Sequence, residues 1–161
     1  MNRSLTYLVV VFALVFSAGS YAGAEAMFER DLAGAEEGDV EAQYDVAYRY
    51  EKGRGVDEDE ELAFQWFLKA AERGLDKAQY KIGLFYLKGT GTDKDAAAAL
   101  AWLEKSAEQG YSPAQYQLGK LYASAAGDRD YERALDWLQK AQDNGYEPAT
   151  SELIRLRRRV D

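Results

Sequence analysis

The sequence predicts an all-α fold, a short right-handed α-solenoid in which about eight helices stack as antiparallel pairs. The first observation is a phrase beginning Ala-Gln-Tyr that recurs every 36 residues, at Ala42, Ala78 and Ala114. The second is an alternating phrase with a tryptophan at its centre, which also occurs three times. A fixed period in this range, with two helical phrases per unit, is typical of stacked helix pairs, because no pair can bury its apolar side alone.

The composition narrows the possible functions. The chain has 161 residues, of which 47% are apolar, and a net charge of −8. Residues 25–61 hold fourteen acids and four bases, whereas residues 62–161 hold fourteen and fifteen. This acidity argues against nucleic acid and anionic membrane surfaces as partners, since both attract cations. The chain has no Cys and no His, so we expect no metal site and no cofactor.

The first 24 residues are typical of a secretory signal peptide. Arg3 gives a positive start, an apolar run extends from Leu5 to Phe16, and small residues precede a cleavage position after Ala24. Cleavage after Ala22 or Ala26 also fits the pattern. The apolar run is shorter than the ~18–20 residues that a membrane-spanning helix needs. We therefore expect a periplasmic or secreted protein with no stable membrane insertion after cleavage.

The rest of the chain, residues 25–161, divides into an N-terminal capping helix, three repeats and a C-terminal capping helix. The predicted units are residues 25–38, 39–74, 75–110, 111–145 and 146–161. In the first unit Phe28, Leu32 and Ala35 form one apolar stripe. The acidic outer side of this unit is what a terminal unit of an array needs to stay soluble.

Each repeat is predicted to hold two helices joined by a loop and followed by a glycine. The first helices carry apolar residues at four-residue spacing, such as Ala42, Val46 and Tyr50. Asp59 and Asp95 are placed to cap the second helices, because a short carboxylate accepts the unpaired amide hydrogens of a first turn. The predicted helices span about residues 40–52, 60–73, 76–88, 96–109, 114–124, 131–144 and 148–159.

Small and large residues alternate where the helices are expected to cross. Gly83 and Gly119 leave room for a close approach in the first helices. The last helix has Ile154 at this position, so no further helix is expected to pack there. The spaces between helices are predicted to be filled by Trp66, Trp102 and Trp137.

The repeats resemble the Sel1-like family, a variant of the tetratricopeptide helix pair with a longer, glycine-bearing connection. The second copy carries the match with Gly83, Tyr86, Gly89, Gly91, Asp95, Ala99, Trp102, Lys105 and Gly110. Ile82 stands where the family has a leucine before its glycine. The resemblance covers about residues 28–160. It implies a binding module that serves as an adaptor in assembly or signalling, often in a bacterial envelope.

The resemblance also implies a binding surface, because the first helices of tetratricopeptide arrays line the concave side. The candidate partner-binding residues are Tyr44, Tyr48, Tyr80, Leu84, Leu87, Lys88, Tyr116, Lys120, Arg155 and Arg158. Rigid aromatic side chains beside Arg and Lys are the residue types that contribute most to interfaces. The tyrosines of the Ala-Gln-Tyr phrase recur with the scaffold, so packing between repeats is an equal alternative for them. Tyr48, Leu84 and Leu87 vary between copies, which favours a role in binding.

Catalysis is not expected. The acids neither recur nor pair inside an apolar pattern, and no Ser-x-x-Lys or Gly-x-Ser-x-Gly motif occurs. The acidic run Asp57–Glu61 lacks the spacing of a calcium loop and fits a solvated helix start.

Three functions remain open at this point. The leading one is an exported protein-protein interaction module, an adaptor or regulator in the bacterial periplasm that binds a protein partner's segment in its concave groove. The first alternative is an immunity protein that binds and blocks a toxin enzyme delivered to the envelope. The second is a hydrolase of cell-wall or lactam substrates, an activity associated with cysteine-rich relatives whose cysteines this chain lacks.

Overall fold

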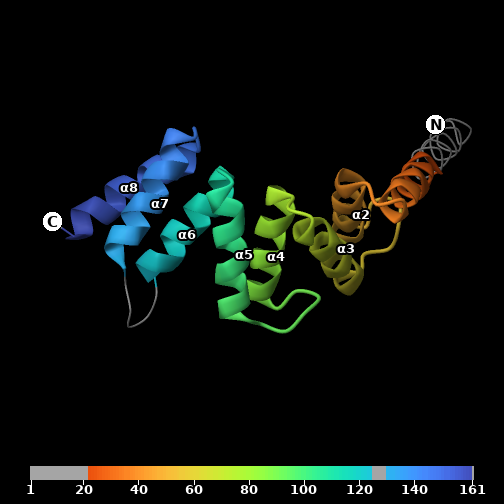
Figure 1. Ribbon diagram of the computed structural model, residues 1–161, viewed down its shortest axis with the longest axis horizontal. Helices are drawn as coiled ribbons and strands as arrows, with labels where there is room; N and C mark the ends of the chain where they lie inside the picture. The colour runs from red at the N-terminus through yellow and green to blue at the C-terminus, as the bar shows by residue number, and fades with distance from the viewer. Residues whose placement is uncertain (1–21, 125–129, 161) are drawn as a thin grey trace, which may run out of the picture.

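The computed structural model describes residues 22–124 and 130–160, and these ranges fold into eight helices without a strand. A helix over residues 22–36 comes first. The others are α2 (Val40–Lys52), α3 (Glu60–Glu72), α4 (Asp76–Lys88), α5 (Ala96–Glu108), α6 (Ser112–Ser124), α7 (Tyr131–Asp143) and α8 (Glu147–Val160). They lie side by side in a row, with the first and last helices at opposite ends of an elongated molecule (Figure 1). The predicted all-α array of helix pairs is confirmed.

The predicted helix bounds agree with the observed ones to within one residue for six of the helices α2 to α8. The exception, α6, begins two residues earlier than predicted, because Pro113 fits a first turn, where its missing amide hydrogen costs nothing. The helix over 22–36 also begins earlier than expected and includes the last residues of the predicted signal peptide. The rest of that signal peptide, residues 1–21, lies outside the described residues, as does the loop 125–129.

Aspartates cap four of the described helices. Asp59 accepts a hydrogen bond from the backbone of Leu62, and Asp95 accepts from Ala97 and Ala98, which confirms both predicted caps. Asp39 and Asp130 cap α2 and α7 in the same way. No described helix is both long and apolar enough to cross a membrane.

The two helices of a pair approach closely at a glycine. A Cβ atom at Gly83 of α4 would lie 2.6 Å from Cγ of Leu103, which belongs to α5 and is fully buried. A Cβ atom at Gly119 of α6 would lie 2.5 Å from Cγ of the buried Leu138 of α7. The predicted role of these glycines is confirmed. At the equivalent position of α8, Ile154 has 48% of its surface exposed.

Consecutive pairs meet through residues that lie 18 positions apart in the sequence. The ring centroids of Phe67 and Phe85 are 5.5 Å apart, and equivalent leucines pack together at the two later junctions. At the first junction the equivalent residues are charged: Asp31 and Arg49 form an ion pair of 2.7 Å, with side chains only 11% and 15% exposed. The N-terminal helix thus has an ion pair at this position in addition to the apolar cluster of Phe28, Ala35 and Val46.

A buried glutamine joins each first helix to the helix before it. The side-chain amides of Gln43, Gln79 and Gln115 donate to the carbonyl oxygen eight residues earlier, at 3.2, 3.2 and 3.0 Å. Gln79 and Gln115 also accept hydrogen bonds from Gln109 and Asn144, at the ends of the next second helices. The Oε1 atom of Gln43 has no such partner. These hydrogen bonds were not predicted from the sequence, although the glutamines are part of the recurring Ala-Gln-Tyr phrase.

The three tryptophans are half-buried and pack at the junctions between helix pairs. A lysine three residues later lies over each ring, at 3.6 Å from the centroid for Lys69, 4.1 Å for Lys105 and 4.3 Å for Lys140. Each tryptophan thus presents one side to the core and the other to an ammonium group.

Candidate protein-binding surface

The first helices α2, α4, α6 and α8 each contribute one candidate residue at the same position of the repeat. These residues are Tyr48, Leu84, Lys120 and Arg155. The side of the four helices that carries them is termed the first-helix face. Tyr48 and Leu84 are half-buried, whereas Lys120 and Arg155 are exposed. The equivalent residues therefore change from aromatic to aliphatic to cationic along the array.

The tyrosines of the recurring phrase pack between repeats. The rings of Tyr80 and Tyr111 have centroids 5.4 Å apart, and those of Tyr116 and Tyr146 are 5.3 Å apart. Tyr44 meets Phe67 of its own repeat edge-on at 5.2 Å, and the ammonium of Lys77 in the next repeat lies 4.2 Å from its ring centroid. Burial is the main cause that raises the pKa of Tyr44 to about 12 and also raises the pKa of Tyr80.

The remaining candidates differ in what they contact. Leu87 packs against the core cluster that contains Leu103 and Leu118. Lys88 and Arg158 are exposed side chains at the edge of the first-helix face. Fewer candidate residues are therefore available to a partner than the sequence predicts, because several of them bury much of their side-chain surface in contacts between repeats.

At the N-terminal half of the face, cations are held by carboxylates and rings. Lys81 of α4 pairs with Glu51 of α2 at 2.7 Å and lies 5.7 Å from the ring centroid of Tyr48. Lys77 pairs with Glu41 at 2.5 Å. Burial alone would raise the pKa of Glu51, but its hydrogen bonds and charge contacts with Lys81 and Lys52 hold it below the ordinary value. The two lysines of this half of the face are thus already paired with carboxylates of α2.

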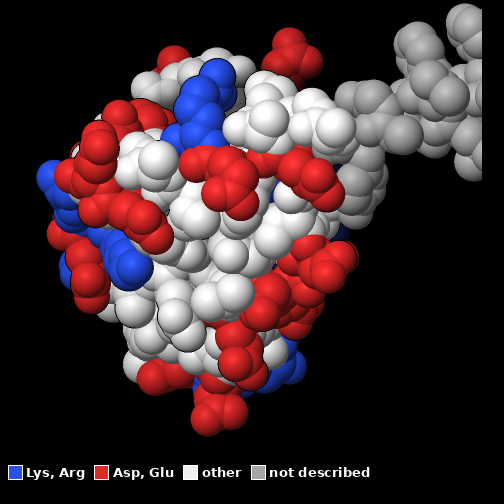
Figure 2. Space-filling model, turned by 90° about the vertical axis from the view of Figure 1, so that its right-hand side faces the viewer, with Lys and Arg blue, Asp and Glu red and all other residues white. Residues whose placement is uncertain are grey.

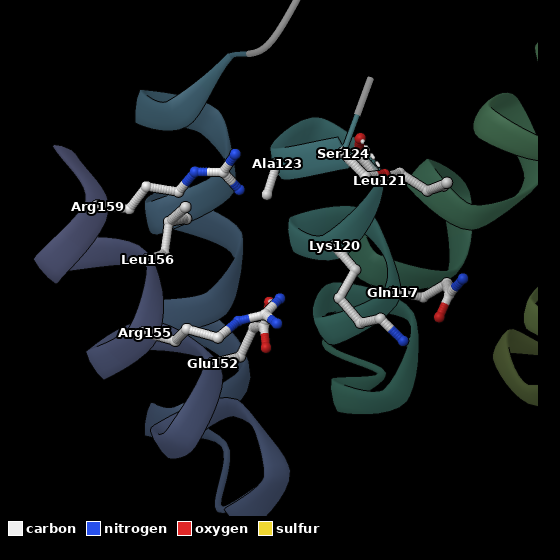
Figure 3. A pocket seen from close by; sticks show the side chains of 9 residues that line it. All are labelled: Gln117, Lys120, Leu121, Ala123, Ser124, Glu152, Arg155, Leu156 and Arg159. Atoms are coloured by element: carbon white, nitrogen blue, oxygen red, sulfur yellow. Dashed lines mark hydrogen bonds and ion pairs between the residues drawn. The ribbon is translucent and has the colours of Figure 1, made fainter. Parts of the chain in front are cut away.

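At the C-terminal half, a hollow of about 470 Å³ opens between α6 and α8. Its lining includes Lys120, Arg155, Arg159, Leu121 and Leu156. Arg155 and Arg159 extend from α8 toward α6, whereas Leu121 points away from α8 (Figure 3). Arg155 pairs with Glu152 at 2.5 Å. Among residues 22–124 and 130–160, no carboxylate lies within ion-pairing distance of the other two cations.

The hollow therefore includes two of the predicted residues, Lys120 and Arg155, and lacks Arg158. Arg159 lines it instead, because residues four apart lie on one side of a helix and Arg159 shares that side with Arg155. Arg159 is not among the candidate residues predicted from the sequence. A count of four residues from Arg155 would have found it.

The opposite end of the molecule carries the other sign of charge. Seen from the N-terminal end, Asp and Glu side chains surround an uncharged area, and Lys and Arg are fewer (Figure 2). This view agrees with the fourteen acids and four bases of residues 25–61. The array is thus acidic at its first helices and has a cationic hollow near its last.

A row of paired helices that presents side chains along its first helices defines a helical-repeat scaffold. Three consecutive segments, residues 40–75, 76–111 and 112–146, match the Sel1 repeat. The chain belongs to the Sel1 repeat family. Repeats of this kind mediate protein–protein interaction, and the family consists generally of scaffolds without enzymatic activity.

Solved structures show the same fold. A Sel1 repeat protein from Oxalobacter formigenes is 33% identical with a TM-score of 0.69, over 83% of this chain and 57% of that one. The antigen c5321, a protective antigen present in uropathogenic Escherichia coli strains and displaying an SLR fold, is 27% identical with a TM-score of 0.73. That match covers 90% of this chain and 35% of the antigen.

The immunity protein Pa5087 from Pseudomonas aeruginosa is more distant, at 20% identity and a TM-score of 0.41, over 82% of this chain and 67% of that one. This chain spans only 57% and 35% of the lengths of the first two proteins. A search of curated proteins found no match.

Proposed function

We propose that the protein is an exported adaptor or regulator of the bacterial periplasm that binds a segment of a partner protein along its first-helix face. The observation that carries this proposal is the row Tyr48, Leu84, Lys120 and Arg155. Around this row the scaffold residues repeat, because the contacts between helices demand the same side chains in each copy. The row itself changes from copy to copy, as expected where side chains meet a partner.

The row also has the chemistry of an interface. Tyr48 is half-buried, with the guanidinium of Arg54 at 5.2 Å from its ring centroid and the ammonium of Lys81 at 5.7 Å. A ring that is already held in place loses little conformational freedom when a partner covers it. Aromatic and Arg side chains contribute most of the binding energy in protein interfaces.

The test is affinity capture from envelope extract with the tagged protein, followed by identification of the proteins that co-elute. The variant Tyr48→Ala/Leu84→Ala should bind the captured partner about tenfold more weakly, or worse, because it removes two large side chains from the face. The matched control is Gln65→Ala/Glu108→Ala, two exposed positions on the second helices α3 and α5. Undiminished capture by a folded Tyr48→Ala/Leu84→Ala variant would refute the proposal.

Export is the second part of the proposal. Its support is the apolar run from Leu5 to Phe16 behind Arg3, with small residues after it. Cell fractionation should recover the protein in the periplasm, shortened at its N-terminus by 22 to 26 residues according to sequencing of the purified protein. A full-length protein in the cytoplasmic fraction would contradict export.

The acidic N-terminal end supports one other function, that of an immunity protein. An acidic surface is suited to cover the basic mouth of a toxin's active site and to accelerate its association. If this function is correct, the gene lies beside one for a secreted toxin, and the purified protein inhibits that toxin at equimolar concentration. Reversal of Glu58, Glu60 and Glu61 to Lys should then slow association, whereas Tyr48→Ala/Leu84→Ala should leave inhibition unchanged.

A further inference from the structure

We propose that the hollow between α6 and α8 binds an acidic segment of the partner protein, with an apolar side chain of that segment placed between its carboxylates. This inference rests on the proposed function, because it gives the chemistry of the segment that the first-helix face would hold. It assigns a specific role to Arg159, Gln117, Leu121 and Leu156, which the candidate set does not include.

The charges of the hollow are unbalanced. Lys120, Arg155 and Arg159 carry three positive charges, and Glu152 carries the only negative charge among the lining residues. The Glu152 carboxylate is engaged by Arg155 at 2.5 Å. Within residues 22–124 and 130–160, Lys120 contacts the Tyr116 ring at 5.2 Å, and neither Lys120 nor Arg159 has a carboxylate partner. Guanidinium groups bind carboxylates through two parallel hydrogen bonds, so Arg159 favours a planar carboxylate over a single-atom anion.

The shape of the hollow sets the size of the ligand. About 470 Å³ is enough for a few residues and too small for a folded domain. Leu156 is 4% exposed and Leu121 is half-buried, and because both line the hollow, part of its surface is apolar and suits an apolar side chain of the ligand. The amide of Gln117 extends from α6 on the same side as Lys120 (Figure 3) and can donate to or accept from a peptide backbone.

The rest of the face restricts the ligand to a short anion. Moving from α6 toward the N-terminus, the cations Lys81 and Lys77 are already paired with Glu51 and Glu41. Beyond them lies the acidic end of the molecule (Figure 2). A long polyanion such as a nucleic acid would be repelled there, whereas an acidic stretch of a few residues reaches only the hollow.

The probe is the peptide Asp-Leu-Glu-Glu, labelled with a fluorophore and blocked at both ends, and binding to the purified protein is followed by fluorescence anisotropy. Its matched control is Asn-Leu-Gln-Gln, which has the same shape without charge. We expect the acidic peptide to bind and the amide peptide to bind at least about tenfold more weakly. A third peptide with Gly in place of Leu should also lose affinity, because it leaves the apolar floor uncovered.

The protein variants separate the hollow from general attraction to positive charge. Lys120→Gln/Arg159→Gln should weaken binding of the acidic peptide at least about tenfold. Lys94→Gln/Lys105→Gln removes the same charge from exposed positions outside the hollow and outside the candidate set, and should change affinity less than about twofold. All four substitutions are at exposed side chains, so both variants should fold, as circular dichroism will show.

Several outcomes would overturn the inference. They are equal binding of the acidic and amide peptides, equal losses in the two double variants, or binding to phosphatidylglycerol vesicles but not to the peptide. Self-association that depends on Lys120 and Arg159 would also overturn it, since the acidic end of a second copy would then be the occupant. If the captured partner needs Tyr48 and Leu84 while the peptide does not bind, the proposed function stands and only this inference fails.

Discussion

Asp31 and Arg49 show how a single position can mark the end of an array. At the other three junctions two apolar side chains meet, whereas here a carboxylate and a guanidinium share the same geometry. The removal of two charges from water costs more than most ion pairs return. We therefore expect the pair to act in specificity, because an apolar residue at position 31 would fit any junction of the array, whereas Asp31 is best matched beside Arg49.

This account predicts a non-additive pair of substitutions. Asp31→Leu should lower the free energy of unfolding by about 3 kcal/mol, because it leaves Arg49 largely buried without a partner. Asp31→Leu/Arg49→Leu should return to within about 1 kcal/mol of the wild type or exceed it, since it restores the apolar pair of the other junctions. Urea unfolding followed by circular dichroism measures both. A double variant as unstable as the single one would show that the charges themselves are required.

The Asp31–Arg49 pair makes the free energy of unfolding depend on pH in the acid range. Burial tends to raise the pKa of Asp31, but the hydrogen bonds and charges of Arg30 and Arg49 outweigh it, so the pKa lies below the ordinary value. A lowered pKa in the folded state gives stability above the unfolded-state pKa, near 3.9, that is lost as pH falls through the folded-state value. Between pH 5 and pH 2 the wild type should lose more stability than Asp31→Leu/Arg49→Leu. Parallel losses would exclude Asp31 as a source.

The N-terminal helix is docked like the second helix of a repeat. A Cβ atom at Gly91 would lie 2.5 Å from the carbonyl carbon of Glu60, at the start of α3. A Cβ atom at Gly55 would lie at the same distance from the carbonyl carbon of Ala24. Both glycines have positive φ, 59° and 78°, so each loop bends back onto the first turn of the preceding second helix. Ala24 therefore contacts the first loop, and this contact is kept by cleavage after Ala22 and lost by cleavage after Ala24 or Ala26.

Truncation tests this docking. A chain that begins at Met27 should melt roughly 3–5 °C below one that begins at Gly23, because it lacks the turn on which Gly55 rests. Gly55→Ala should destabilise the longer chain more, since only there does the new methyl group overlap Ala24. Gly91→Ala, whose contact is present in both chains, is the matched control and should affect them equally. Equal melting temperatures of the two chains would refute the role of Ala24.

The helices could be predicted from the sequence because each signal for them is local. A 36-residue period, aspartates such as Asp59 and glycines such as Gly89 define where helices begin and end, whatever the neighbours. The Asp31–Arg49 pair could not be predicted in this way. The sequence around a charged residue in an apolar stripe does not show whether that residue has a partner, and here the partner lies 18 residues away.

The candidate site was predicted less well than the helices. Lys120 and Arg155 could be predicted because they occupy the same position of the repeat as Tyr48 and Leu84, and equivalent positions lie on the same face of the array. The hollow could not be predicted, since it depends on how α6 and α8 pack against α7, and the repeat pattern does not give that packing. The division of the tyrosines between core and surface likewise required their contacts, such as that of Tyr80 with Tyr111.

The molecule as a whole should be sensitive to alkali. The pKa of Tyr44 is raised to about 12, and the pKa values of four other tyrosines are raised, with burial as the largest cause for all five. The four are Tyr50, Tyr80, Tyr111 and Tyr122. A raised pKa in the folded state gives stability below the unfolded-state value, near 10, that is lost as pH rises through the folded-state value.

We therefore expect the free energy of unfolding to fall steeply between pH 10 and pH 12, with phenolate absorbance appearing together with the loss of helical circular dichroism. Tyr44→Phe should reduce this loss, because it removes the tyrosine with the largest shift. Tyr131→Phe, at the first residue of α7, serves as the comparison. Ionisation of all tyrosines near pH 10 without unfolding would contradict the expectation.

Each helix of the array contacts chiefly its neighbours in the sequence, so the two ends do not depend on each other. Duplication of residues 76–111, one matched repeat, should therefore give a longer protein that folds through the same junctions. The insertion would move the acidic end one helix pair further from the cationic hollow. A partner held at one end would bind the longer protein with unchanged affinity. A partner that contacts both ends would lose its contact with one of them and bind more weakly. Affinity as a function of repeat number thus reports how much of the array a partner spans.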